Sequence, residues 1–282
     1  MSKFQEKRVL ITGGASGIGK IVGRMSLEKG ASALIIWDIN QQNIDATVAE
    51  LSAYGRVFAY RVDVSSESSV EQTYERVRRE VGAVDILINC AGIVTGNGYF
   101  DSVSTADIHR TMDINATAPM IITSQILPEM VARDSGHICN IASAGGLIAN
   151  PRMAVYAASK WAVIGWSDSV RIELRERKSR VRVTTVAPYY TKTGMFDGVR
   201  SRLLPLLEPE YVARKIVRAI ERDTAFQCIM NFIVPLSMHF VRSMQGLLPI
   251  RVFDWLFGEV VGIYHTMDNF TGRINPHAVS KK

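Results

Sequence analysis

The stretch Thr12-Gly-Gly-Ala-Ser-Gly-Ile-Gly19 lies between a short apolar run at residues 9–12 and a helical pattern at residues 18–29. Its glycines allow a tight backbone turn and a close approach to a pyrophosphate, whose charge the N-terminus of the following helix stabilises. A glycine-rich turn also occurs as a plain tight turn, so the motif needs support from its surroundings. Its candidate cofactor-binding residues are Gly13, Ser16, Gly17, Ile18 and Gly19.

Short β-rich runs alternate with helical patterns through the first two-thirds of the chain. Strands are expected at residues 9–12, 33–37, 57–62, 85–89, 136–141, 181–186 and 226–234. Helices are expected at residues 18–29, 43–54, 68–81, 155–177 and 209–222, with one long helix between the fourth and fifth strands. Because the strands are apolar on both faces and helices connect them, they predict buried parallel strands joined by crossovers.

This pattern predicts an α/β fold: a single Rossmann-type, doubly wound domain over residues 1–282, with a seven-stranded parallel sheet. No internal repeat and no Pro/Ser/Gly-rich linker divides the chain. Residues 188–207 lack a clear periodicity and are expected to form a substrate loop. Residues 235–282 are expected to form an apolar, helical C-terminal extension.

Composition and charge exclude several classes of protein. Of the 282 residues, 47% are hydrophobic and 21% charged, which is typical of a globular chain rather than a disordered one. The net charge is +6, but the basic residues form only short clusters such as residues 175–180, so nucleic-acid binding is not expected. Cys90, Cys139 and Cys228 lack CxxC spacing, which predicts neither a metal site nor disulfides. With no secretion signal and no long apolar run, a cytoplasmic location is expected.

Asp38 ends the second expected strand, 19 residues after Gly19. A carboxylate at this position can accept hydrogen bonds from an adenosine ribose and repels a 2′-phosphate. No arginine directly follows it, so NAD is favoured as the cofactor and NADP stays an alternative. Asp63, after the third expected strand, can accept a hydrogen bond from adenine or merely cap the strand end.

Tyr156 and Lys160 are four residues apart in a helical segment, so both side chains project from one face. A phenol with a pKa near 10 is a poor acid–base group at neutral pH. The neighbouring ammonium is expected to stabilise the phenolate and lower this pKa. Ser143, at the end of the fifth expected strand, can orient a substrate oxygen. Such a Tyr–Lys pair is usually found on a surface, and its combination with Ser143, the glycine turn and Asp38 indicates an active site.

Taken together, these motifs resemble the short-chain dehydrogenase/reductase family, and the resemblance runs from about Arg8 to about Val234. Several spaced motifs in the family's order make it specific. The matching pieces are Thr12-Gly-x-x-x-Gly-Ile-Gly19, Asp63-Val64, Asn89-Cys-Ala-Gly92, Asn115, Ser143, Tyr156-x-x-x-Lys160, and Pro188 with Thr193.

The resemblance implies an NAD(P)-dependent oxidoreductase that interconverts an alcohol with a ketone or aldehyde by hydride transfer. Tyr156 would give or take the hydroxyl proton, and Ser143 would position the substrate oxygen. Lys160 would lower the pKa of the tyrosine and bind the nicotinamide ribose. Asn115 would hold a water that links Lys160 to solvent, unless it is only a polar residue at a helix kink.

The resemblance also implies cofactor contacts beyond the glycine turn: Asn89, Gly92, Pro188, Thr193, and Val64 beside Asp63. Two positions depart from the family's pattern. Cys90 stands where a second asparagine is usual, which we expect to alter packing only. Tyr189 stands where a glycine usually follows the proline, which adds bulk near the nicotinamide.

The residues expected around the substrate are mostly apolar, and no arginine or histidine among them suits an anionic substrate. They predict a pocket for a lipophilic alcohol or ketone, although such residues also form ordinary core. The candidate pocket residues are Gly145, Leu147, Tyr189, Tyr190, Met195 and Phe196.

Trp37-Asp-Ile-Asn40 and Met267-Asp-Asn-Phe-Thr-Gly-Arg273 resemble the branch of the family that holds retinol dehydrogenases and 17β-hydroxysteroid dehydrogenases. Residues 232–264 either pack as a helix pair that closes the pocket, which is preferred, or touch a membrane surface. The resemblance implies a homodimer or homotetramer. Two alternatives remain: an NADPH-dependent carbonyl reductase, and a cofactor- or lipid-binding module without catalytic activity.

Overall fold

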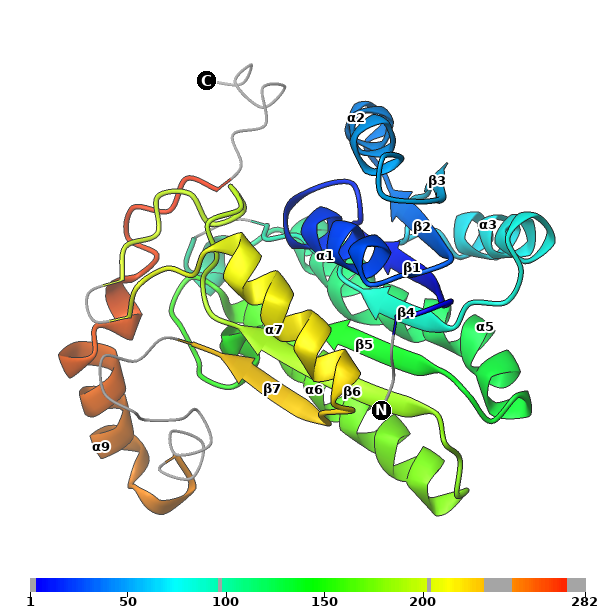
Figure 1. Ribbon diagram of the computed structural model, residues 1–282. Coiled ribbons are helices and arrows are strands. Elements are labelled where there is room, and N and C mark those ends of the chain that lie inside the picture. The colour runs from blue at the N-terminus through cyan, green and yellow to red at the C-terminus, as the bar shows by residue number, and fades with distance from the viewer. Residues whose placement is uncertain (1–3, 96–97, 202–203, 231–244, 273–282) are drawn as a thin grey trace.

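The apolar runs form a seven-stranded, all-parallel sheet with the order β3-β2-β1-β4-β5-β6-β7 (Figure 1). This computed structural model describes residues 4–95, 98–201, 204–230 and 245–272. Its strands are β1 (Arg8–Thr12), β2 (Ala33–Asp38), β3 (Val57–Arg61), β4 (Ile86–Asn89), β5 (His137–Ile141), β6 (Arg182–Pro188) and β7 (Phe226–Ile229). The predicted doubly wound sheet is confirmed; residues 231–234 of the last expected strand lie outside the described residues.

Helices cover both faces of the sheet (Figure 1). They are α1 (Gly17–Glu28), α2 (Gln41–Leu51), α3 (Glu67–Glu80), α4 (Thr105–Met112), α5 (Ala118–Ala132), α6 (Ala154–Glu176), α7 (Pro209–Glu221) and the short α9 (Ile250–Asp254). Shorter helical turns are η1 (Phe100–Ser102), η2 (Asp113–Thr117), η3 (Ala144–Gly146), η4 (Trp255–Val260) and η5 (Ile263–His265).

Successive residues of the central strands enter different cores, because side chains alternate across a strand. Ile11 and Ile36 belong to the core that includes residues of α1 and α7, whereas Leu10 and Ile35 belong to the core that includes residues of α3 and α5. All four side chains are fully buried. Burial on both faces explains why these strands read as continuous apolar runs.

The order of the strands reverses direction at β1, which pairs with β2 on one side and with β4 on the other. Thr12 therefore lies level with Trp37 and with Asn89 at the carboxyl edge of the sheet. In open α/β sheets a crevice forms at this reversal and holds the ligand. The fold thus places the glycine turn, which follows Thr12, at the mouth of that crevice.

The helix expected between the fourth and fifth strands is not continuous. It is divided into α4, the π-helical turn η2 and α5. Asn115 lies in η2, where its side chain bonds to the backbone of Ile93: Nδ2 donates to the carbonyl oxygen at 2.9 Å, and Oδ1 accepts from the amide at 2.8 Å. The expectation of one helix was wrong because a buried polar side chain is tied to a neighbouring loop here, as is common at π-turns.

Besides α7 and β7, the chain after β6 has loops that are joined to one another by backbone hydrogen bonds. The carbonyl of Asp197 accepts hydrogen bonds from the amides of Thr271 and Gly272, at 2.9 and 3.1 Å. Gly198 has a φ of +83°, and a Cβ atom there would lie 2.0 Å from the carbonyl oxygen of Asn269. These contacts join the expected substrate loop to the C-terminal segment.

In the C-terminal segment, the described residues 245–272 form short helical turns, and the expected helix pair over residues 232–264 lies partly outside the described residues. Phe253 and Phe257 pack into the core, whereas Leu247, Ile250 and Trp255 are exposed. Within the described part of the chain, no helix is both long and apolar enough to cross a bilayer. Residues 231–244 and 273–282, which belong to the expected extension or its borders, lie outside that part.

Candidate active site

A cavity of about 280 Å³ opens at the carboxyl edge of β1 and β4, where the crevice was expected. It is lined by most of the residues that the sequence predicted to bind a cofactor: Gly13, Ser16, Gly17, Ile18, Gly19, Asp38, Asp63, Val64, Gly92, Tyr156, Lys160, Pro188 and Thr193. Residues more than 150 positions apart in the chain therefore meet around one space.

The glycines of the turn are required by close packing. Gly13 has a φ of +65°, and a Cβ atom there would lie 2.9 Å from the Cα of Ala91. A Cβ atom on Gly19 would lie 2.3 Å from the carbonyl oxygen of Gly13. Side chains at either position would push the turn away from the sheet, so the glycines allow the first turn of α1 to reach the cavity.

The N-terminus of α1 fits a pyrophosphate. Side chains of Asn40, Ser66 and Ser104 accept hydrogen bonds from the first turns of α2, α3 and α4, but Ser16 makes no such bond at the start of α1. The amide groups of this first turn are therefore not capped by the N-cap side chain, and the helix dipole favours an anion beside them. A dinucleotide cofactor bound along the cavity would place its phosphates here.

Two carboxylates line the part of the cavity near β2 and β3. Asp38 is fixed by two backbone amides, with Oδ2 accepting from Ala15 at 3.1 Å and Oδ1 accepting from Asn40 at 3.1 Å. The Oδ1 atom of Asp63 accepts from the amide and hydroxyl of Ser65, so this side chain also caps its turn. Both of the roles considered for Asp63 are therefore compatible with its position.

Ser143, Tyr156 and Lys160 are brought together at one end of this cavity. Tyr156 and Lys160 project from α6, and Nζ of Lys160 lies 5.8 Å from the centre of the Tyr156 ring. Ser143 follows β5 and forms a side-chain hydrogen bond with Tyr156, while its Oγ accepts from the amide of Gly145 at 3.1 Å. The arrangement places two hydroxyl groups where a substrate oxygen can bond to both.

The pKa of the tyrosine differs from expectation. Burial raises the pKa of Tyr156 to about 12, although the hydrogen bond from Ser143 lowers it in part. Burial also lowers the pKa of Lys160 to about 8, and its Nζ donates to the carbonyl of Ile141 at 3.0 Å. Desolvation is the largest influence on the pKa of Tyr156, and the expected lowering of this pKa by Lys160 stays a prediction.

Asn115 lies behind this group rather than on the cavity wall. A Cβ atom added to Gly92 would lie 3.4 Å from Oδ1 of Asn115 and 3.6 Å from Nζ of Lys160, so both side chains border the space beside Gly92. Nδ2 of Asn115 also donates to Oγ of Ser159 at 3.2 Å. Asn115 is thus both a kink residue and a near neighbour of Lys160.

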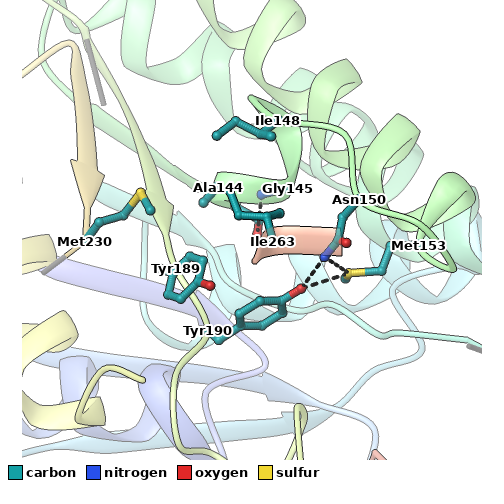
Figure 2. A pocket seen from close by; sticks show the side chains of 10 residues that line it. Ala144, Gly145, Ile148, Asn150, Met153, Tyr189, Tyr190, Met230 and Ile263 are labelled. Carbon is teal, nitrogen blue, oxygen red and sulfur yellow. Dashed lines mark hydrogen bonds between the residues drawn. The ribbon is translucent and has the colours of Figure 1, made fainter. Parts of the chain in front are cut away.

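A second, apolar cavity adjoins the first at Ser143 and Tyr189 (Figure 2). Of the predicted pocket residues, Gly145, Tyr189 and Tyr190 line it, while Met195 and Phe196 line the larger cavity. The Phe196 ring meets the rings of Tyr156 and Tyr190 edge-on, with centres 5.9 and 5.0 Å apart. Apolar and aromatic side chains therefore lie around the hydroxyls of Ser143 and Tyr156.

Besides Asn115, two predicted residues are not among those that line either cavity. Leu147 is buried in the core, and its neighbour Ile148 lines the apolar cavity instead. Asn89 is buried at the end of β4, where its Nδ2 donates to Oδ1 of Asn140 and to Oγ1 of Thr123, at 2.8 and 3.2 Å. It cross-links the strand ends that carry the site.

Several cavity residues were not predicted from the sequence: Ile93, Arg110, Ile114, Ile148, Asn150, Met153, Met230 and Ile263. Most come from segments without periodicity or from far along the chain. Of these residues, only Asn150 could have been recognised from the sequence. It is a single amide side chain in an otherwise apolar stretch, directly before Pro151.

This fold and this site define a nicotinamide-dependent oxidoreductase, and comparison with known proteins supports that class. The family model described as short chain dehydrogenase matches residues 7–203. The chain therefore belongs to the short-chain dehydrogenase/reductase family, whose members act on CH–OH groups and the corresponding carbonyls.

Among relatives, human (Homo sapiens) epidermal retinol dehydrogenase 2 is 37% identical over 268 residues, which cover 93% of this chain and 84% of that protein. Retinol dehydrogenase 10 of Xenopus tropicalis is 34% identical over 274 residues, covering 86% and 78%. A short chain dehydrogenase/reductase from Burkholderia phymatum, solved in complex with NAD, superposes with a TM-score of 0.74 at 25% identity, covering 81% of this chain and 90% of that one.

Proposed function

We propose that this protein interconverts lipophilic alcohols and their ketones or aldehydes, with NAD as its preferred cofactor and Tyr156 as the proton-transferring residue. One observation carries the proposal: Ser143, Tyr156 and Lys160 meet where the cofactor cavity adjoins an apolar cavity. When the oxygen of a substrate forms hydrogen bonds with the hydroxyls of both Ser143 and Tyr156, the carbon that carries this oxygen lies where the two cavities meet.

The protonation states follow from burial. With a pKa of about 12, Tyr156 keeps its proton at neutral pH, which is the form that donates to a carbonyl oxygen during reduction. The hydroxyl of Ser143 forms a hydrogen bond with the same carbonyl oxygen and orients it toward Tyr156. Alcohol oxidation requires the phenolate, so it benefits from a charged Lys160 nearby and from higher pH. A bound nicotinamide supplies the hydride acceptor or donor.

The preference for NAD rests on Asp38. Its carboxylate is fixed by two backbone amides at the edge of the cavity, so it cannot turn away from a ribose-bound phosphate without losing those bonds. The residues that follow it, Ile39 and Asn40, offer no cation. One observation favours the alternative of an NADPH-dependent reductase: Arg110 lines the same cavity and brings a positive charge to it.

The lipophilic substrate class is supported by the apolar walls and by the relatives, two of which are named retinol dehydrogenases. The alternative of a silent binding module is disfavoured because Ser143, Tyr156 and Lys160 are all present and adjacent. A pure cofactor or lipid binder has no need of three aligned proton-handling groups.

The test is a matrix of cofactors and substrates on purified protein. NAD or NADP is paired with steroid, retinoid, long-chain and aryl alcohols, and absorbance is followed at the reduced-nicotinamide band. We expect turnover of bulky apolar alcohols with NAD, and a loss of about 100-fold or more in Tyr156→Phe. Turnover with NADP alone would overturn the cofactor assignment. Unchanged activity of Tyr156→Phe would overturn the catalytic one.

A further inference from the structure

The apolar cavity beside Ser143 is much smaller than the cofactor cavity. Its volume is about 30 Å³, compared with about 280 Å³ for the larger one. A water-sized group needs roughly 10–15 Å³ of such space, so the small cavity has room for about two groups of that size. Its size therefore matches a methyl or ethyl group better than a longer arm.

The wall of this cavity includes a residue from the C-terminal segment. Ala144, Gly145 and Ile148 line the cavity together with Ile263 of η5 (Figure 2). Ile263 is buried, at 7% exposure, and lies well beyond residue 203, where the match to the family model ends. The size of the cavity thus depends on a part of the chain outside the family's common core.

Hydrogen bonds fix Ile263 in place. The hydroxyl of Thr266 donates to the carbonyl of Ile263 at 2.8 Å, and it accepts from Nδ2 of Asn150 at 2.9 Å. The same amide nitrogen donates to Oη of Tyr190 at 2.7 Å. Figure 2 shows this nitrogen directed at the Tyr190 hydroxyl. The backbone of Ile263 is thus linked through Thr266 to Asn150, and through Asn150 to Tyr190.

We propose that Ile263 is a specificity-determining residue, and that the small cavity receives the smaller of the two substituents on the reacting carbon. The inference rests on the proposed function, because that carbon must lie beside Ser143 and Tyr156. The larger substituent then extends along Met195 and Phe196, which line the larger cavity. The preferred substrates are accordingly primary alcohols and carbinols with one methyl or ethyl arm.

This arrangement has a stereochemical consequence. If only one substituent fits the small cavity, a ketone with unequal arms binds in one orientation. Its two faces are then not equivalent toward the cofactor, and reduction gives one enantiomer in excess. Enlarging the small cavity lets both orientations bind, so the excess must fall.

The experiment compares reduction of 2-octanone, 3-octanone and 4-octanone by the wild type, with NADH and NADPH. These isomers have the same composition, and only the length of the shorter arm changes. Since one methylene changes specificity in an apolar pocket by roughly 10-fold or more, we expect kcat/KM to fall at least about 10-fold from 2-octanone to 4-octanone.

The variant Ile263→Ala is expected to raise kcat/KM for 4-octanone relative to 2-octanone by at least about 10-fold. It should also bring the 2-octanol product, resolved on a chiral column, closer to equal enantiomers. The matched control is Ile250→Ala, the same substitution at an exposed position of the same segment, and it should keep the wild-type profile. If Ile263→Ala does not fold, Ile263→Val tests the same direction with a smaller step.

Equal kcat/KM for the three ketones in the wild type would overturn the inference while leaving the enzyme assignment intact. A profile in Ile263→Ala that matches the wild type would do the same. A different result separates the two proposals: if no octanone is reduced and none of the steroid, retinoid, long-chain and aryl alcohols is oxidised with either cofactor, the proposed function fails and the inference fails with it.

Discussion

The parallel sheet and the segment after β6 are held together by different kinds of contact. In the sheet, fully buried side chains such as Leu10 and Ile35 pack against helices on both faces. After β6, outside α7 and β7, hydrogen bonds such as those of Asp197 and Thr266 join loops that are distant in the sequence. The first region carries the candidate cofactor site and the candidate catalytic hydroxyls, and the second carries part of the expected substrate wall.

This difference indicates how the site divides its tasks. Groups that transfer a proton must keep their geometry, and regular packing around a sheet provides it. A substrate wall held by a few local bonds can change shape at little cost to the rest of the fold. Substitutions in the two regions should therefore separate effects on cofactor and chemistry from effects on substrate choice.

The largest expected effect concerns Lys160, a buried cation in the sheet region. Burial lowers its pKa from 10.5 to about 8, so the charged form is disfavoured in the folded state. The stability linked to this group is present above pH 10.5 and is lost as pH falls to about 8. Lys160→Met should therefore raise the free energy of unfolding by about 3 kcal/mol at pH 7, with the gain vanishing toward pH 10.5.

Urea unfolding at several pH values measures this gain. Lys192→Met is the control, because Lys192 is exposed and paired with Glu208 at the surface; it should change stability by less than about 0.5 kcal/mol. A Lys160→Met protein no more stable than the wild type at pH 7 would show that the ammonium is well compensated by its surroundings.

The next effect concerns the glycine turn. In Gly19→Ala, the added Cβ would lie 2.3 Å from the carbonyl oxygen of Gly13, so the turn must open. Since overpacking of this kind costs about 1–3 kcal/mol, we expect NADH affinity to fall by up to about 100-fold. Titration of NADH by fluorescence measures it, with circular dichroism to confirm the fold. Unchanged affinity would mean that the turn does not form the cofactor site.

The smallest effect concerns the segment after β6. Gly198 has a φ of +83°, and in Gly198→Ala the added Cβ would lie 2.0 Å from the carbonyl oxygen of Asn269. This clash would push the substrate loop away from the C-terminal segment. Because strain of this kind costs about 1–3 kcal/mol, KM for the alcohol should rise about 10-fold. The dissociation constant of NADH should stay at the wild-type value. An equal loss of cofactor affinity would contradict the division between the two regions.

The regular part of the fold could be predicted from the sequence because its signals are local. Strands such as residues 33–37 are apolar on both faces, and the glycine turn marks the reversal at β1. That Ser143, Tyr156 and Lys160 meet could be predicted because the tyrosine and the lysine share one helix face and the serine follows a strand. Each of these inferences needs only the periodicity of a helix or strand, or the position of a residue at the end of a strand.

The remainder depends on contacts between distant segments. Ile263 reaches the apolar cavity because Thr266 is bonded to Asn150, 116 residues earlier, and no periodicity reports such a pairing. Leu147 and Ile148 are adjacent and equally apolar, so only the backbone path after η3 decides which of them lines the cavity. The high pKa of Tyr156 likewise follows from its degree of burial, which the spacing to Lys160 does not reveal.

The π-turn at Asn115 has a consequence for how this chain tolerates insertions and deletions. A π-turn contains one residue more than an α-helical turn, and each residue of an α-helix advances the rotation by 100°. Because the wider turn absorbs this residue, α4 and α5 keep nearly the phase of one continuous helix, and Ile122 and Ile126 remain in the core on the sheet. Deleting one residue from η2 would close the turn to α-helical geometry, so the packing of α5 is expected to survive while Asn115 loses its place near Lys160.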